Sequence, residues 1–255
     1  MNGITIFAPE GNAAVRFAAG DLSDRGINIA DTPAEDVTHL LLPVPSFDRD
    51  GNIRGCGAPE PVLKALPKDV TVIGGGLGHP ALKGRRQIDL LEDAQYLAEN
   101  AAITADCAIR IAGSNLSTVF RGCPILVIGW GRIGKCLARQ LAQMGTEVTV
   151  AARGESDRAM VQALGFRAEH TQALRFGLLR YRVIFNTVPA PVLSREQLRF
   201  CRSDCVLIDL ASQPGIAGDT VIWARGLPGK DVPEASGHLI ARCVLRRLAA
   251  REAAI

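Results

Sequence analysis

Short apolar runs alternate with segments of helical periodicity along most of the chain. Ile125–Ile128 is an apolar run rich in β-branched residues, which is typical of a buried parallel strand. Leu137, Leu141 and Met144 then recur at the spacing of one helix face, and the run Glu147–Ala152 predicts a second strand. This order predicts a strand–helix–strand unit in the middle of the chain.

The first third of the chain shows the same alternation. Apolar runs predict strands at residues 4–8, 27–30, 39–42 and 70–73, and helical patterns cover residues 13–25 and 61–66. Strands that alternate with helices imply a small parallel sheet. Residues 92–111 then predict a long helix, or two shorter ones, that connects this part to the central unit, because no Pro- or Ser-rich linker is present.

The last third continues the pattern. A helix is predicted at residues 156–164, with Ser156 as its N-cap, and strands are predicted at residues 165–169, 183–186, 206–210 and 221–224. Residues 233–251 predict an amphipathic basic helix with Ile240, Val244 and Leu248 on one face. We expect this helix to dock on the protein rather than on a membrane or a nucleic acid.

The turn between the central strand and its helix has the spacing G-x-G-x-x-G, formed by Gly129, Gly131 and Gly134. The first glycine allows a tight turn, the second lets the backbone approach a pyrophosphate, and the third lets helix and strand pack closely. The helix that begins here presents free N–H groups and the positive end of its dipole to that phosphate. The motif therefore predicts a dinucleotide site; the alternative is a glycine-rich turn that binds nothing.

The end of the second strand bears on which dinucleotide would bind. An NAD-preferring site usually has Asp or Glu there for the ribose hydroxyls, whereas this chain has Arg153, with Arg158 nearby. Arginine pairs with a 2′-phosphate and stacks on adenine, so we expect NADP, with NAD as the less favoured cofactor. The alternative is a solvated arginine at a strand end. The full set of expected cofactor contacts lies at the carboxyl ends of predicted strands: Gly129, Trp130, Gly131, Arg132, Ile133, Gly134, Arg153, Asn186, Thr187, Val188, Ala211, Ser212 and Leu227.

These patterns predict an α/β fold made of a small N-terminal parallel α/β domain and a doubly wound Rossmann domain, with a cleft between them. We expect a flavodoxin-like domain at residues 1–95 and a Rossmann NADP-binding domain at residues 96–238. The remaining residues, 239–255, are expected to form a C-terminal helix that can dock on the first domain.

Composition and charge narrow the class of protein. The 255 residues are 47% hydrophobic and 22% charged, an ordinary composition for a soluble protein with two modest domains. A net charge of +3 without a long basic run gives no support to a nucleic-acid partner. No apolar stretch reaches membrane-spanning length and the N-terminus lacks a signal pattern, so no membrane association is expected.

The cysteines and histidines point away from a metal site. Seven cysteines, an odd number with no Cys-x-x-Cys pair, suggest reduced thiols in a cytoplasmic protein. Cys201 and Cys205 are separated by three residues, but the chain has only four histidines and we expect no zinc site.

The stretch Gly74–Pro80 follows the fourth predicted strand of the first domain. Ligands in open α/β sheets bind beyond the carboxyl ends of strands, and the glycines here allow a ligand or another backbone to come close. His79 in this stretch can donate to a carboxylate or act as an acid or base. The alternative is a surface histidine in a flexible turn.

Several stretches, in this order, resemble the family of dipicolinate synthase A subunits, from the sporulation pathway that branches off lysine biosynthesis. They are residues 100–109, 127–134, 152–153, 186–189, 208–215 and 226–229, followed by Pro233 and Gly237. The resemblance covers roughly residues 90 to 250 well and the first domain only loosely. It implies a small α/β domain followed by a Rossmann domain, similar to 2-hydroxyacid dehydrogenases.

The chain departs from the family's pattern mainly in the half expected to hold substrate. Ile103, Asp106 and Cys107 stand where the family has Pro, Glu and Gly. Near the N-terminus, residues 8–12 stand where the family tends to have Gly-Gly-Asp followed by arginine. After Pro214 and Gly215, Ile216 stands where the family has a second glycine. The nucleotide half keeps the pattern, so the resemblance is stronger for the cofactor than for the substrate.

The resemblance implies the oxidation of a cyclic lysine-pathway dicarboxylate, hydroxytetrahydrodipicolinate or its dehydrated form, to dipicolinate with NADP⁺. The implied carboxylate contacts are Asn100, Thr104, His79 and Lys230, and Asp106 either orients a base or caps a helix. The family also implies a B subunit, similar to a flavoprotein, as partner. A homo-oligomer is left open by the sequence.

Two other classes of function stay open. One is a different NADP-dependent reductase of the hydroxyacid type, although no histidine follows the last predicted strand, where Leu227-Pro-Gly229 stands. The other is a non-catalytic nucleotide-binding subunit.

Overall fold

The computed structural model describes residues 3–252, which form two compact units. Unit 1 comprises the chain up to Asn100 and again from Pro228, and unit 2 is Ala101–Leu227. The divisions therefore fall after residues 100 and 227, whereas the sequence analysis expected them after residues 95 and 238; both of these expected positions lie inside helices. These helices are α3 (Ala94–Asn115), which begins in unit 1 and ends in unit 2, and α8 (Pro233–Glu252).

Unit 1 is built on a five-stranded parallel sheet. Its elements are β1 (Thr5–Phe7), α1 (Ala13–Asp24), β2 (Asn28–Ala30), β3 (His39–Leu41), α2 (Pro59–Lys64), β4 (Thr71–Gly74), β5 (Gln87–Asp89), and the 3₁₀ turns Pro80–Leu82 and Leu90–Glu92. The strand order β2-β1-β3-β4-β5 is the flavodoxin-like order. The strands are short and the central ones are almost fully buried, which explains why they appear in the sequence as apolar runs rather than as alternating patterns.

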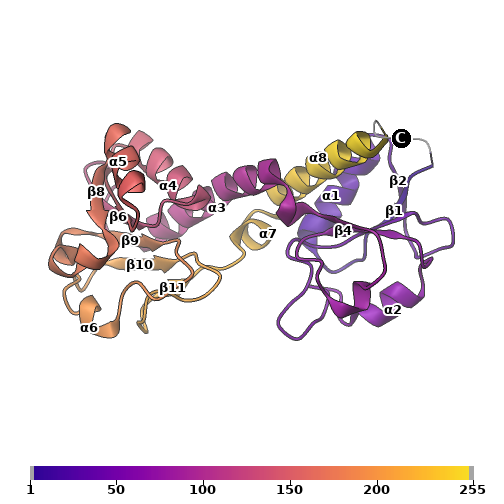
Figure 1. Cartoon of the computed structure of the whole chain (residues 1–255), viewed down its shortest axis with the longest axis horizontal. Helices are drawn as coiled ribbons and strands as arrows, with labels where there is room; N and C mark the ends of the chain where they lie inside the picture. The colour runs from indigo at the N-terminus through magenta and orange to yellow at the C-terminus, as the bar shows by residue number, and fades with distance from the viewer. Residues whose placement is uncertain (1–2, 253–255) are drawn as a thin grey trace. The chain divides into compact units, whose positions relative to one another are not determined.

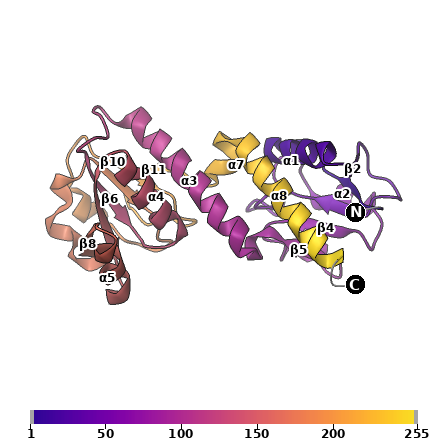
Figure 2. The same cartoon turned by 90° about the horizontal axis from the view of Figure 1, so that it is seen from above.

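Helix α8 packs lengthwise against α1, and both views show the two helices side by side (Figures 1 and 2). Gly237 permits this contact: a Cβ there would lie 2.5 Å from the Phe17 Cβ and 2.7 Å from the Ala14 carbonyl oxygen. The apolar face predicted for the C-terminal helix is buried, at Ile240, Val244 and Leu248.

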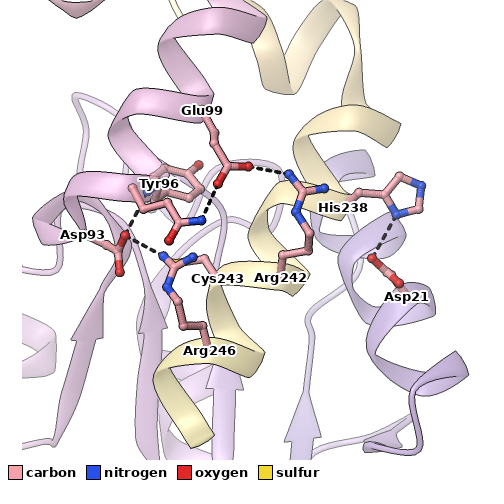
Figure 3. Close-up of polar contacts among 9 residues, drawn as sticks. Asp21, Asp93, Tyr96, Glu99, His238, Arg242, Cys243 and Arg246 are labelled. Carbon is pink, nitrogen blue, oxygen red and sulfur yellow. Dashed lines mark hydrogen bonds and ion pairs between the residues drawn. The ribbon is translucent and has the colours of Figure 1, made fainter. Parts of the chain in front are cut away.

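Charged side chains tie α8 to the start of α3 (Figure 3). Arg246 donates to Asp93 at 2.6 Å and Arg242 donates to Glu99 at 2.6 Å. Asp93 precedes α3 and accepts from the Tyr96 N–H, and this bond and the Arg246 guanidinium lower the pKa of Asp93. The C-terminal helix is therefore fixed to unit 1 by packing on α1 and by ion pairs to α3.

Unit 2 is built on a six-stranded parallel sheet. Its elements are β6 (Pro124–Ile128), α4 (Arg132–Gln143), β7 (Glu147–Ala152), α5 (Glu155–Ala163), β8 (Arg167–His170), β9 (Val183–Asn186), α6 (Arg195–Leu198), β10 (Val206–Asp209), β11 (Ile222–Trp223) and two 3₁₀ turns at Thr171–Phe176 and Leu178–Arg180; α7 (Leu227–Asp231) follows. The order β11-β10-β9-β6-β7-β8 is the doubly wound Rossmann order, with the switch point between β6 and β9. The predicted α/β class, a small parallel α/β unit and a doubly wound Rossmann unit, is confirmed.

Several local predictions were wrong. Helix α5 begins at Glu155 with Gly154 as N-cap, so Ser156 lies in its first turn and is not the cap. The strand predicted at residues 165–169 spans 167–170, because Gly165 has a left-handed φ of 85° and belongs to the turn. Strand β5 was missed because Gln87–Asp89 has a single apolar residue.

Among the described residues, no helix is long and apolar enough to cross a membrane.

Candidate functional site

The glycine turn after β6 has the local geometry that its spacing predicts. Gly129 has φ 106°, a conformation that strains any other residue. A Cβ at Gly129 would collide with the Thr187 side chain, and a Cβ at Gly134 would collide with the carbonyl oxygen of Gly129. The first and third glycines are therefore required by the packing of the protein itself.

The second glycine differs from its two neighbours in this turn. Gly131 is the N-cap of α4, is exposed and has an ordinary φ of −78°, and no atom lies within 4 Å of a Cβ built there. No side chain caps the helix, so the first N–H groups of α4 are available to a ligand. The open space in front of a helix N-terminus is the cradle that a pyrophosphate needs.

A cavity of about 710 Å³ adjoins this turn. It lies at the carboxyl ends of β6, β7 and β9, where nucleotides bind in sheets of this order. Its lining residues are Gly129, Trp130, Ala151, Ala152, Arg153, Asp157, Thr171, Gln172, Val188, Pro189, Ala190, Pro191, Val192 and Gln197. Four of the predicted cofactor contacts are in this set: Gly129, Trp130, Arg153 and Val188. The volume falls within the usual range for small-molecule sites.

The charged rim of the cavity consists of Arg153 and Asp157. Arg153 follows β7 directly and is exposed, and its side chain forms no ion pair with the described part of the chain. Arg158 instead donates to the carbonyl oxygens of Ala152 and Arg153, at 3.2 and 2.6 Å, and so supports the strand end. Asp157 was missed by the sequence analysis, although its position in the first turn of α5, four residues after Arg153, could have indicated it.

Asn186 lies at the end of β9 but does not line the cavity. Its side-chain amide donates to the Val188 carbonyl oxygen and to the Asp209 carboxylate, both at 3.0 Å, and its oxygen accepts from the Val188 N–H. The side chain is fully buried, and both its amide nitrogen and its amide oxygen form hydrogen bonds within the protein. Asn186 therefore shapes the loop that borders the cavity.

Asp209 is buried as well, next to Asn186. Unlike Asn186, it was not among the site residues that the sequence analysis predicted. Besides the Asn186 amide, its carboxylate accepts from the N–H groups of Ala211, Gly215 and Ile216 at 2.6 to 3.0 Å. These four bonds compensate the burial of a charge and join the loops that leave β9 and β10.

The other predicted cofactor residues lie outside the lining of the cavity. Thr187 donates to the Ile128 carbonyl oxygen, and the Ala211 carbonyl oxygen accepts from the Trp223 indole at 3.0 Å. Ser212 is exposed after β10, and Leu227 is buried at the start of α7. Arg132 and Ile133 occupy the first turn of α4.

His79 belongs to a tightly bonded turn of unit 1. Its Nδ1 accepts from the Ala81 N–H at 3.2 Å, and its ring stacks on Phe47 with centroids 4.3 Å apart. The backbone just before His79 is held by Asp89, whose carboxylate accepts from the N–H groups of Gly76 and Leu77. His79 is thus an ordered, half-buried histidine rather than one in a flexible turn.

The remaining predicted substrate contacts lie on α3 and α7. Asn100 and Thr104 are one turn apart on the same face of α3, with Asn100 half-buried and Thr104 buried. Asp106 is exposed and, two residues from Thr104, points to a different side of the helix. Lys230 is exposed near the end of α7. None of these four residues, nor His79, lines the 710 Å³ cavity.

The fold and this cavity define the class: a two-unit α/β protein whose second unit has a Rossmann nucleotide-binding fold of the oxidoreductase type. Residues 124–209 match the family described as "NADP oxidoreductase coenzyme F420-dependent". The match runs from β6 to the end of β10 and so includes the glycine turn and Asp209.

Over most of its length the chain is similar to a dipicolinate synthase A subunit. The chain is 27% identical over 241 residues to the one from Bacillus subtilis (strain 168), which covers 87% of this chain and 81% of the relative. This match confirms the resemblance inferred from the motifs.

Solved structures agree at the level of the fold. The dipicolinate synthase A subunit from Bacillus halodurans has a TM-score of 0.84 at 22% identity and covers 97% of this chain and 98% of its own. A transhydrogenase from Sinorhizobium meliloti has a TM-score of 0.72 at 13% identity, covering 97% of this chain and 94% of its own. The fold of this chain is therefore shared with both of these proteins.

Proposed function

We propose that this chain acts as a dipicolinate synthase A subunit. It would oxidise a cyclic lysine-pathway dicarboxylate, hydroxytetrahydrodipicolinate or dihydrodipicolinate, to dipicolinate with NADP. The observation that carries the proposal is the open glycine cradle at Gly131 beside a cavity of nucleotide size, in a chain similar over most of its length to such a protein. The chain would act in the cytoplasm.

The residues present fit a nicotinamide dinucleotide. The free N–H groups at the start of α4 would hold the pyrophosphate, since among the described residues only the chain neighbours of Gly131 come within 4 Å of a Cβ built there. Arg153 at the cavity rim would pair with a 2′-phosphate, which favours NADP over NAD. Asp157 on the same rim would instead accept a hydrogen bond from a ribose hydroxyl, so the two side chains together would set the preference between NADP and NAD.

When bound, the nicotinamide ring supplies the hydride acceptor. The protein would hold the substrate's two carboxylates and orient its ring, because aromatisation already favours the oxidation. Asn100 and Thr104 would contribute neutral hydrogen-bond donors from one face of α3. Lys230 would contribute a positive charge. Asp106, on a different side of the helix, is better suited to capping or to orienting another group.

His79 would serve as a hydrogen-bond donor. Because its Nδ1 accepts from the Ala81 N–H, the neutral ring carries its proton on Nε2. An Nε2–H group donates to a carboxylate but does not take up a proton. In this arrangement His79 would bind substrate rather than act as the base.

Two other functions remain to be separated by experiment. A hydroxyacid-type NADP reductase would use the same cavity, and a non-catalytic subunit would bind the nucleotide without turnover. Titration with NADPH, followed by turnover assays on lysine-pathway dicarboxylates and on small 2-keto acids, distinguishes the three. Dipicolinate formation supports the proposal, reduction of keto acids supports the first alternative, and binding with no turnover in the presence of a B subunit supports the second.

A second polypeptide is part of the proposal. The relative in Bacillus subtilis is named as one lettered subunit of its enzyme, which implies another subunit in that protein. We expect the same of this chain, whose partner would be a flavoprotein-like B subunit and whose small-molecule ligand would be the dicarboxylate.

A further inference from the structure

Two of the seven cysteines form a pair outside the nucleotide site. Cys201 and Cys205 lie in the segment between α6 and β10. Two consecutive turns shape this segment, closed by the N–H groups of Cys201 and Cys205 on the carbonyl oxygens of Leu198 and Arg202. Both side chains pack against the same hydrophobic cluster of unit 2, and both residues are half-exposed. The turns thus bring two accessible thiols together.

The two thiols have different acidities because they touch each other. A hydrogen bond from the Cys205 thiol lowers the pKa of Cys201. The same contact with Cys201, together with burial, raises the pKa of Cys205. Burial raises the pKa of Cys56 and of Cys136, the other two half-buried thiols. Cys201 is therefore the half-buried cysteine best able to be a thiolate, and Cys205 is a protonated neighbour.

This arrangement matches the general requirements of an oxidation-sensitive thiol. Reactive cysteines combine thiolate character with solvent access, and a second thiol in contact turns the first oxidation product into a disulfide. Beside Cys205, the Asp204 carboxylate raises the pKa of the thiol and the Arg202 guanidinium, which donates to Asp204 at 2.7 Å, lowers it, so the two nearby charges act in opposite directions. The cluster under the pair also includes Val188 and Val192, which line the nucleotide cavity.

We propose that Cys201 and Cys205 form a modification site for hydroperoxides, in which Cys201 is oxidised first and Cys205 closes a reversible intramolecular disulfide. The Cys201 thiolate attacks one peroxide oxygen, the O–O bond breaks, and the leaving oxygen takes up a proton, which gives a sulfenic acid at Cys201. The Cys205 sulfur then attacks the Cys201 sulfur, the S–S bond forms, the S–O bond breaks and water leaves with the Cys205 proton. The two thiols lose two electrons and the peroxide gains them; a dithiol reductant reverses the change.

The test uses the full-length reduced protein with equimolar hydrogen peroxide at neutral pH, followed by alkylation and peptide mass mapping over time. We expect Cys201 and Cys205 to lose their alkylation sites together and several-fold faster than Cys56, because the thiolate is the reactive form and the pKa of Cys201 is lowered while that of Cys56 is raised. A dithiol reductant should restore both sites. The matched control Cys56→Ser should leave this rate unchanged.

Two variants separate the roles of the pair. Cys205→Ser should accumulate a sulfenic acid at Cys201 that a dimedone probe captures, whereas Cys201→Ser should make Cys205 as slow as Cys56. Thermal melting shows that each variant is folded before the comparison. The proposal is overturned if Cys201 is oxidised no faster than Cys56, or if the wild type gives sulfinic acid at Cys201 while Cys205 remains open to alkylation.

Discussion

Replacing Gly131 with valine tests the nucleotide cradle with little damage to the fold. The backbone of Gly131 has an ordinary φ, and a Cβ there meets no atom within 4 Å, so the new side chain projects into open space. Valine is a poorer N-cap than glycine, and we expect the free energy of unfolding to fall by about 1 kcal/mol. The same side chain would occupy the position of the pyrophosphate.

The loss of affinity should greatly exceed the loss of stability. A hydrogen bond to a charged group contributes about 1.5–3 kcal/mol, so displacing the pyrophosphate from two N–H groups of α4 should cost at least about 3 kcal/mol. That corresponds to a Kd for NADPH raised by more than about a hundredfold. Isothermal titration with NADPH, alongside denaturant unfolding of the same sample, measures both quantities.

Gly131→Ser is the matched control. Serine is a favoured N-cap, so this variant should be at least as stable as the wild type, yet its side chain still enters the cradle. If weakened helix capping explained the valine variant, serine would restore NADPH binding. If Gly131→Val bound NADPH as tightly as the wild type, the glycine turn would be a packing feature and the cofactor assignment would fail.

Three further predictions follow from named side chains. Arg153→Asp should remove or reverse the preference for NADPH over NADH, at a cost of about 1–3 kcal/mol for the lost 2′-phosphate pair; equal affinities for the two nucleotides in the wild type would refute the role of Arg153. The double variant Asn100→Ala, Thr104→Val should remain folded and bind NADPH while losing at least about tenfold in kcat/KM; an unfolded protein, or an unchanged kcat/KM, would favour a purely structural role. Asp93→Ala should lower the free energy of unfolding by about 1–2 kcal/mol, through the lost cap and the Arg246 ion pair. The pKa of Asp93 in the folded protein lies below its usual 3.8, so the stabilisation by its carboxylate is fully present above pH 3.8 and is lost as the pH falls through the folded pKa. If Asp93→Ala were as stable as the wild type at pH 7, this role of Asp93 would be contradicted.

The sequence was most informative where function depends on the backbone. The spacing of Gly129, Gly131 and Gly134 predicted three separate roles, and the first and third follow from collisions that a Cβ would cause. Such requirements are local and appear directly as residue type. The parallel α/β class of both units likewise follows from the alternation of apolar runs and helical patterns, although β5 was missed.

The sequence was least informative where a side chain acts through distant partners. Asn186 was expected to contact the cofactor, but its amide is used by Asp209, which is 23 positions away in the chain. Asp89 likewise holds the glycine stretch that includes Gly76, 13 positions earlier in the chain. No pattern of residue types distinguishes a polar side chain that binds a ligand from one that braces a loop, because the difference lies in which backbone N–H groups the fold brings near.

The ion pairs of α8 show the same limit. The basic residues of the C-terminal helix were recognised as a polar face, but their partners could not be assigned. Arg242 and Arg246 reach Glu99 and Asp93, more than a hundred residues earlier in the chain, once the helix is docked (Figure 3).

The most direct test of the proposed function is the stoichiometry of the oxidation. The purified chain is mixed with a B subunit, freshly generated lysine-pathway dicarboxylate and NADP⁺, and dipicolinate and NADPH are quantified together over time. The account predicts that both products appear in equal amounts, and that Gly131→Val, which retains the fold, forms neither. Absence of both products with the wild-type chain, while NADPH still binds, would contradict the assignment of substrate and reaction.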